Sequence, residues 1–175
     1  MASFREDSND NQDSDWGLLF YGPVTLYMRV DVLERHLEWL RAHHYVVNDL
    51  DARDWASEED FHRGVQRGLG LPESYHHNLD VFTDFARELP VPDVGGRAIV
   101  FRAFDTFFRT CPSVAHAALD ILAVCSRHRS LVGQRLVILV QAETRLPIDP
   151  VGAVPVGWSR EEERLMKRRG RAETP

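Results

Sequence analysis

The chain has few of the features that mark membrane proteins, nucleic-acid-binding proteins or secreted disulfide-bonded proteins. Its 175 residues contain no apolar run near the roughly 18 residues that span a bilayer, and no basic start followed by an apolar stretch. Acidic residues outnumber basic ones, because the chain has 27 Asp and Glu and 21 Lys and Arg. Its formal net charge is therefore -6. A cationic protein surface is therefore a better complement than a phosphate backbone. We expect a soluble, cytoplasmic protein that binds neither nucleic acid nor membrane.

Cysteine is also scarce. Cys111 and Cys125 are the only two, and both lie among apolar residues. We expect buried thiols of a reducing compartment rather than a disulfide. A Cys–His nucleophile with His116 or His128 is the alternative, but each of these residues lies on or near an apolar helical stripe. Core packing is the favoured interpretation.

The spacing of apolar residues predicts strands that alternate with helices. β-prone runs occupy residues 18–21, 24–28, 45–50, 98–101 and 136–140. Helices are predicted to begin at Asp31, Ser57, Asn78, Ser113 and Ser159, and Gly70 is predicted to end the second of them. The last two strands are apolar throughout, as in strands covered on both faces. The order predicts an α/β fold with a small, mainly parallel sheet flanked by helices.

Residues 71–84 are the most informative segment, because they predict a helix end, a short loop and a new helix. Steps of three and four residues place Asp80, Thr83, Asp84 and Arg87 on one face of that helix. One interpretation is a solvated face with acids near the helix start, and the other is a surface complementary to a cationic cleft. Paired carboxylates acting as general acid and base would need a buried cleft, of which the polar surroundings give no hint.

A metal site at His76, His77 and Asp80 is disfavoured. Adjacent histidines on a loop rarely point the same way, and no Glu or His completes a helical ligand pair. The glycines are too dispersed to cradle a phosphate. We expect no metal, no cofactor and no enzymatic activity.

The same segment resembles the signature of the barstar family, the intracellular inhibitors of small secreted bacterial ribonucleases. Residues 46–140 also follow that family's order of strands and helices. The resemblance implies a three-layer arrangement with a three-stranded parallel sheet. The residues that match the signature are Leu71, Pro72, Glu73, Tyr75, Asn78, Leu79, Asp80 and Asp84.

The resemblance also implies an antitoxin-like partner, a small microbial ribonuclease bound as a 1:1 heterodimer. The loop and acidic helix would block its active site, with Asp84 in place of a substrate phosphate and Asp80 as its acidic neighbour. A carboxylate on a rigid helix finds charge-assisted hydrogen bonds in a cleft built for phosphate. The expected partner-binding residues are Ser74, His76, His77, Asn78, Asp80, Thr83, Asp84 and Arg87.

Some positions depart from the family pattern. Ser74, Thr83 and Leu89 stand where aromatic residues are usual, and His76 stands at the usual glycine of the loop. Aromatic anchors contribute much of the energy of tight interfaces. These departures favour a second hypothesis, a non-catalytic module that keeps the fold but binds a non-nuclease protein.

The predicted organisation has four parts. Residues 1–15 form a disordered acidic tail, 16–43 a strand and helix extension, 44–142 the barstar-like domain, and 143–175 an irregular extension with a short helix. The two extensions are expected to widen the sheet, to cover its edge or to form a second contact surface.

Overall fold

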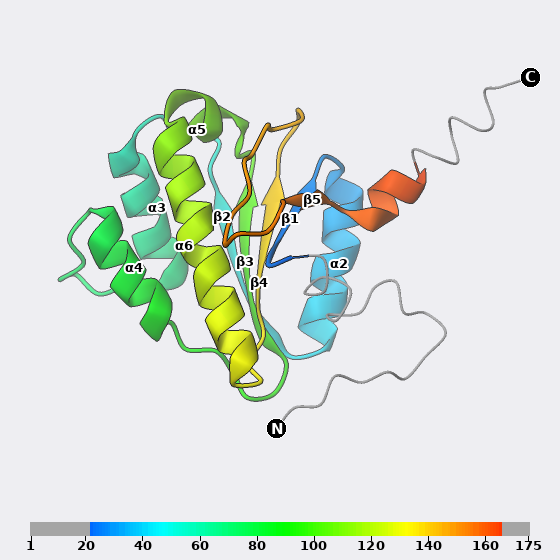
Figure 1. Cartoon of the computed structure of the whole chain (residues 1–175), viewed down its shortest axis with the longest axis horizontal. Helices are drawn as coiled ribbons and strands as arrows, with labels where there is room; N and C mark the ends of the chain where they lie inside the picture. The colour runs from blue at the N-terminus through cyan, green and yellow to red at the C-terminus, as the bar shows by residue number, and fades with distance from the viewer. Residues whose placement is uncertain (1–21, 166–175) are drawn as a thin grey trace, which may run out of the picture.

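The structure is a computed structural model that describes residues 22–165. Predictions for residues 1–15 and for the run at 18–21 lie outside the described residues. The described chain forms an all-parallel, five-stranded sheet between two layers of helices (Figure 1). The strands are β1 (Val24–Tyr27), β2 (Tyr45–Asp51), β3 (Gly96–Arg102), β4 (Leu136–Gln141) and β5 (Gly157–Trp158). The helices are α2 (Val30–Ala42), α3 (Glu58–Leu69), α4 (Leu79–Glu88), α5 (Asp105–Thr110), α6 (Pro112–Leu131) and a last helical turn at 160–165.

The sheet contains the three strands that the family resemblance implies, and two more. The order β2-β3-β4-β1-β5 shows that β1 widens the sheet by pairing with β4, with Val24 opposite Ile138. The short β5 then pairs with β1, with Thr25 opposite Gly157. The prediction of an irregular segment is therefore wrong at β5. A two-residue strand is too short to show periodicity, and its pairing depends on the open edge of β1.

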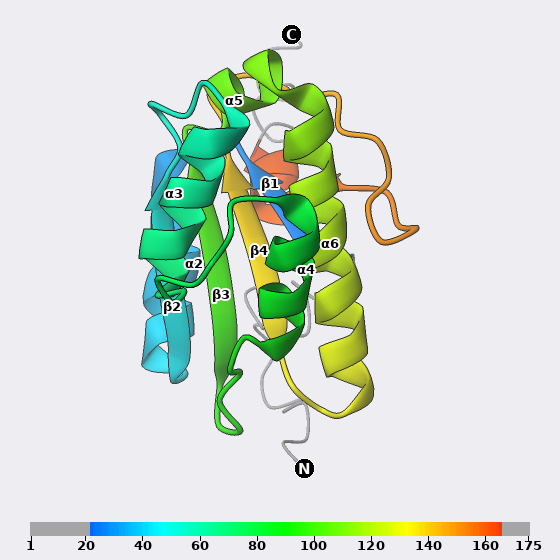
Figure 2. The ribbon, with the colours of Figure 1, turned by 90° about the vertical axis from the view of Figure 1, so that its left-hand side faces the viewer.

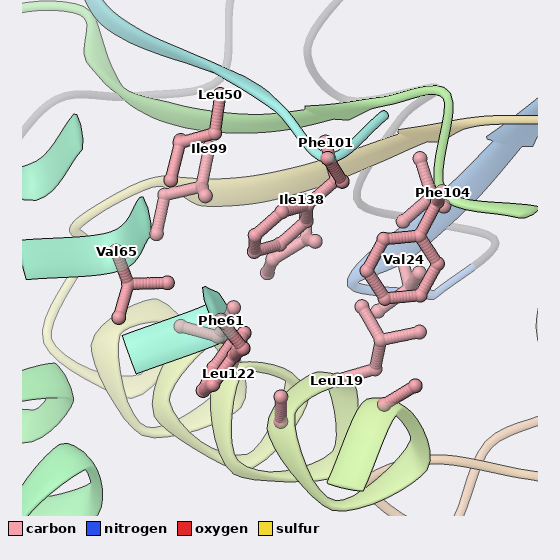
Figure 3. Close-up of a cluster of buried hydrophobic side chains, with 14 of the residues drawn as sticks. Val24, Leu50, Phe61, Val65, Ile99, Phe101, Phe104, Leu119, Leu122 and Ile138 are labelled. Atoms are coloured by element: carbon pink, nitrogen blue, oxygen red, sulfur yellow. The ribbon is translucent and has the colours of Figure 1, made fainter. Parts of the chain in front are cut away.

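The core consists of two layers because the central strands are buried on both faces. Ile99 and Phe101 of β3 point into a large cluster beneath α3, α4, α5 and α6, which Figure 3 shows in part. Ala98 and Val100, which alternate with them, point into a smaller cluster beneath α2. The aromatic rings of Phe61 and Phe107 stack at 5.4 Å within the large cluster. This alternation explains why β3 and β4 are apolar throughout and confirms the predicted α/β fold.

Two predicted helix ends agree with the structure. The Ser57 hydroxyl accepts a hydrogen bond from the Asp60 backbone N–H at 3.2 Å, and Gly70 adopts a left-handed conformation (φ 68°) at the end of α3. At Ser159 the backbone carbonyl accepts from the Glu163 N–H at 3.0 Å, as at a helix start. The buried hydroxyl of Ser159 makes no hydrogen bond in the described part of the chain. Ser159 thus begins the last helical turn through its backbone.

The prediction that Ser113 caps a helix is wrong. Helix α6 begins at Pro112 with Cys111 in the N-cap position, and no side chain caps it. Proline suits the first helical position because its missing N–H would have no partner there. The preceding helix α5 was not predicted; its buried Asp105 carboxylate accepts from the backbone N–H groups of Glu143 and Thr144. That carboxylate ties the chain after β4 to the chain after β3.

Residues 143–165, which we call the C-terminal strap, are part of the folded unit. The strap crosses α6, where the Gly152 N–H donates to the Asp120 carboxylate at 2.7 Å. It then adds β5 and ends against α2 (Figure 1). There the Glu162 carboxylate, 1% exposed, accepts from the backbone N–H groups of Met28 and Arg29 at 3.1 and 2.9 Å. The strap covers the edge of the sheet that β1 would otherwise leave open.

Both cysteines are free thiols, as expected, and Cys125 is buried whereas Cys111 is half-buried. Burial raises the pKa of the Cys125 thiol. Across residues 22–165, the helices are too short or too polar to serve as membrane-spanning segments.

The strap generates a first prediction. Glu162→Gln should lower the free energy of unfolding by about 1–3 kcal/mol, because backbone N–H groups at the start of α2 lose a buried charged acceptor. Chemical denaturation measures the change. The neighbouring Glu163 is exposed, so Glu163→Gln serves as the control and should leave stability within about 0.5 kcal/mol of wild type. Equal effects of the two substitutions would contradict this account of the strap.

The packing of α3 against the core leads to a second prediction. A Cβ at Gly64 would lie 2.1 Å from the Trp55 ring, so Gly64→Ala should destabilise the fold by about 1–3 kcal/mol despite the better helix propensity of alanine. Arg67→Ala, at an exposed position of the same helix, is the control. Thermal denaturation that ranks Gly64→Ala as the more stable variant would contradict close packing of α3 on Trp55.

Candidate functional site

The predicted site lies on the loop between α3 and α4 and on α4 itself. These elements and α6 face the viewer in Figure 2, in front of the sheet. The loop, residues 71–78, is held by its own backbone: the Leu71 N–H donates to the Gln66 carbonyl, and the Tyr75 N–H to the Pro72 carbonyl. The Gln66 side-chain amide also donates to the Pro72 carbonyl at 2.9 Å. The loop therefore follows the end of α3 in one defined path.

Tyr75 anchors the middle of the loop. Its ring is 4% exposed and lies edge-on to Phe85 of α4. Its hydroxyl lies 2.5 Å from Nδ1 of His62, a fully buried side chain of α3. Burial raises the pKa of the Tyr75 hydroxyl and lowers the pKa of the His62 imidazole, so both groups are held neutral. One residue of the loop thus joins both helices.

His77, predicted to contact a partner, lies against α3 instead of pointing freely outward. Its Nδ1 is 2.8 Å from Oε1 of Glu59, and its Nε2 is 3.2 Å from Oε1 of Gln66. Its ring stacks on that of His62 at 5.8 Å with an interplanar angle of 12°. The adjacent His76 is exposed. The two histidines therefore point in different directions, as expected for neighbours on a loop.

Helix α4 presents the two predicted carboxylates to solvent. Asn78 is its N-cap, and the side-chain oxygen accepts from the Val81 N–H at 2.8 Å. Phe82 and Ala86 are buried against the core. Asp80 and Asp84 lie on the exposed side, one helical turn apart. The cap and the buried face together fix where the carboxylates point.

Of the other residues predicted on this face, Arg87 lies near Asp84 and is exposed, whereas Thr83 is half-buried. The Arg87 guanidinium is 3.8 Å from the Asp84 carboxylate, and both side chains are largely exposed, at 60% and 75%. An exposed pair at this distance is weak and leaves the carboxylate accessible. The Thr83 hydroxyl donates to the Leu79 carbonyl at 2.8 Å. The exposed members of the predicted site are Ser74, His76, Asn78, Asp80, Asp84 and Arg87.

The far end of α4 is also held in place. Arg129 of α6 donates to the backbone carbonyl of Arg87 and, at 3.0 Å, to that of Leu89. These carbonyls belong to the last turn of α4 and the residue after it, where helical partners are missing. The acidic helix is thus anchored at its start by its cap and at its end by a neighbouring helix.

The sequence-based prediction missed the residues of α3 that support the loop. Glu59, His62 and Gln66 follow one another at three- and four-residue spacing and so share one face of α3. That spacing was a usable signal for a shared helix face. Their contacts with His77 and Tyr75 show that the face supports the loop.

Two solvent-facing carboxylates on one helix suit the binding of a cationic group. Across the described residues, no three His, Cys, Asp or Glu side chains come together as metal ligands. Asp80 and Asp84 are both exposed on α4. A rigid helix with two solvent-facing carboxylates can accept hydrogen bonds from arginine or lysine side chains.

Comparison with protein families gives one match that covers this site. Residues 31–141, more than half of the chain, match the model of Barstar (barnase inhibitor). The match begins within α2 and ends at the last residue of β4, so it includes α3, the 71–78 loop and α4. Comparison with curated proteins gives no match. The chain belongs to the barstar (barnase inhibitor) family.

Proposed function

We propose that the chain inhibits a small barnase-type ribonuclease in the cytoplasm, as a 1:1 complex, by placing the acidic face of α4 in the active-site cleft. The single observation that carries this proposal is the exposure of Asp80 and Asp84 on a helix held at both ends, inside the segment that matches the family. Asp84, 75% exposed, takes the position of a substrate phosphate, and Asp80 provides a second acceptor.

Rigidity contributes to affinity because binding then orders little new structure. The Asn78 cap, the buried Tyr75 and the contacts of Arg129 with the end of α4 are present in the free protein. The carboxylates are therefore directed before the partner arrives. The charge of -6 steers the chain toward a cationic enzyme and raises the association rate.

The exposed part of the site has no aromatic anchor. Within residues 71–88 the rings of Tyr75 and Phe82 are buried and that of Phe85 is half-buried, while Ser74 is exposed at a position where the family often has an aromatic. Affinity must then depend mainly on charge pairs and on rigidity. The same observation favours a second candidate function, binding of a non-nuclease protein with a cationic surface.

Substitution of Asp84 tests the proposal. Asp84→Ala should weaken binding to the inhibited ribonuclease by about 2–5 kcal/mol, since cationic groups in the cleft lose a desolvated partner. Inhibition assays against a panel of small microbial ribonucleases identify the enzyme, and isothermal titration calorimetry then measures the loss. Asp93→Ala removes the same charge from an exposed loop outside the site and is the matched control.

Two outcomes would count against this function. A loss below about 0.5 kcal/mol for Asp84→Ala would place the carboxylate outside the desolvated interface. Failure to inhibit any barnase-type ribonuclease, at low or high salt, would favour the second candidate function.

A further inference from the structure

The hydrogen-bond partners of His77 lie on both sides of its ring. The Gln66 side-chain amide nitrogen donates to the Pro72 carbonyl, which can only accept. This contact orients the amide so that its oxygen, at 3.2 Å, faces Nε2 of His77. On the other side of the ring, Nδ1 of His77 faces the carboxylate of Glu59 at 2.8 Å. Both ring nitrogens therefore face groups that can only accept a hydrogen bond.

A neutral imidazole cannot satisfy both contacts. It carries one N–H, so its second nitrogen would direct a lone pair at the lone pairs of an oxygen. An imidazolium donates from both nitrogens, and its hydrogen bond to the Glu59 carboxylate is charge-assisted. The geometry around His77 thus favours the protonated ring.

The ring of His62, which stacks on that of His77, is favoured in its neutral form. Its Nδ1 can accept from the Tyr75 hydroxyl, and its Nε2 faces the Glu58 carboxylate at 3.5 Å, so a neutral ring suits both directions. Its burial, at 0% exposed, disfavours charge and lowers its pKa. Because two stacked cations would repel, one charged and one neutral ring is the consistent arrangement.

The charged and titratable groups around His77 come from two elements. From α3 they are Glu59 and His62, with Glu58 beyond His62, and from the loop Tyr75. Within residues 22–165, α4 contributes neither a hydrogen bond nor an ion pair to His77. The acidic groups on α3 thus favour a positive charge on the ring, and His62 opposes it when protonated.

We infer that protonated His77 is a positioning residue that fastens the 71–78 loop to α3 and so holds the N-cap of α4, and with it the acidic face, in the binding orientation. His77 directly precedes the cap residue Asn78, so a loop that leaves α3 moves the start of the acidic helix. The effect on a partner rests on the function proposed above. The contacts that fasten the loop exist in the free protein.

The sign of the pH dependence follows from these contacts. The closed loop needs a proton on His77 to satisfy both acceptors, so lower pH favours the closed loop. His62 acts in the opposite direction. Burial lowers its pKa, so its contribution to stability is present above its ordinary pKa of 6.5 and is lost as the pH falls from there through the lowered pKa. The wild-type chain and the His77→Gln chain both contain His62, so a difference between their pH responses reports on His77.

Hydrogen exchange of the free, full-length chain tests the inference. The reporters are the backbone N–H groups of Asn78 and Val81, which are hydrogen-bonded in the loop and the cap. From about pH 8 to about pH 5.5, and after correction for the intrinsic rate, protection should rise about threefold to tenfold in the wild type. His77→Gln, which cannot titrate, should abolish this rise. The exposed neighbour provides the matched control, since His76→Gln should keep the wild-type profile.

The wild-type chain provides an independent measurement. Ring-nitrogen NMR at about pH 6 should show the imidazolium pattern for His77 and the neutral pattern for His62. A neutral His77 there, or an equal pH response in the His77→Gln chain, overturns the inference. Neither measurement involves a ribonuclease. A loop that responds to pH in a chain that inhibits no ribonuclease would therefore contradict the proposed function and leave this inference intact.

Discussion

The arrangement of the site depends on the attachment of the 71–78 loop to α3. The Tyr75 hydroxyl and the His62 ring are buried and lie within hydrogen-bonding distance of each other. Separating them would leave a polar group unpaired in the core, which is costly. The close fit of Gly64 on Trp55 fixes α3 on the core in turn. The core thus positions α3, α3 positions the 71–78 loop, and the loop positions the start of α4. These contacts together set the direction of Asp80 and Asp84.

The surroundings of α4 explain how an exposed helix of only ten residues can be rigid. Short helices are marginal in isolation, and most of their stability comes from packing and caps. Here one face is buried, Asn78 satisfies a backbone donor at the start, and Arg129 satisfies carbonyls at the end. Among the described residues, Asp80, Asp84 and Arg87 on the opposite side stay exposed. The polar groups that face inward therefore matter as much for recognition as those that face outward.

The parts of the fold that were predicted correctly are governed by local rules. The caps Ser57 and Asn78 and the left-handed Gly70 depend on the few residues around them, and the apolar strands β3 and β4 follow from burial on both faces. The misplaced start of α6 is also local, because Pro112 occupies the first helical position. The missed β5, in contrast, depends on contacts between distant segments, since it pairs with β1. The direction of His77 is of the second kind, because its partners lie eleven and eighteen residues away in the chain.

The absence of an exposed Phe, Tyr or Trp ring in residues 71–88 leaves the interface dependent on other contacts. Charge pairs at a solvent-accessible rim contribute little to affinity, whereas a fully desolvated carboxylate contributes much if it arrives already oriented. A mobile acidic loop would lose part of that gain to ordering. An inhibitor with Ser74 and Thr83 in place of bulky anchors therefore depends more strongly on the support of its acidic helix from within. That dependence gives the inward-facing His77 its importance, although it need never touch the partner.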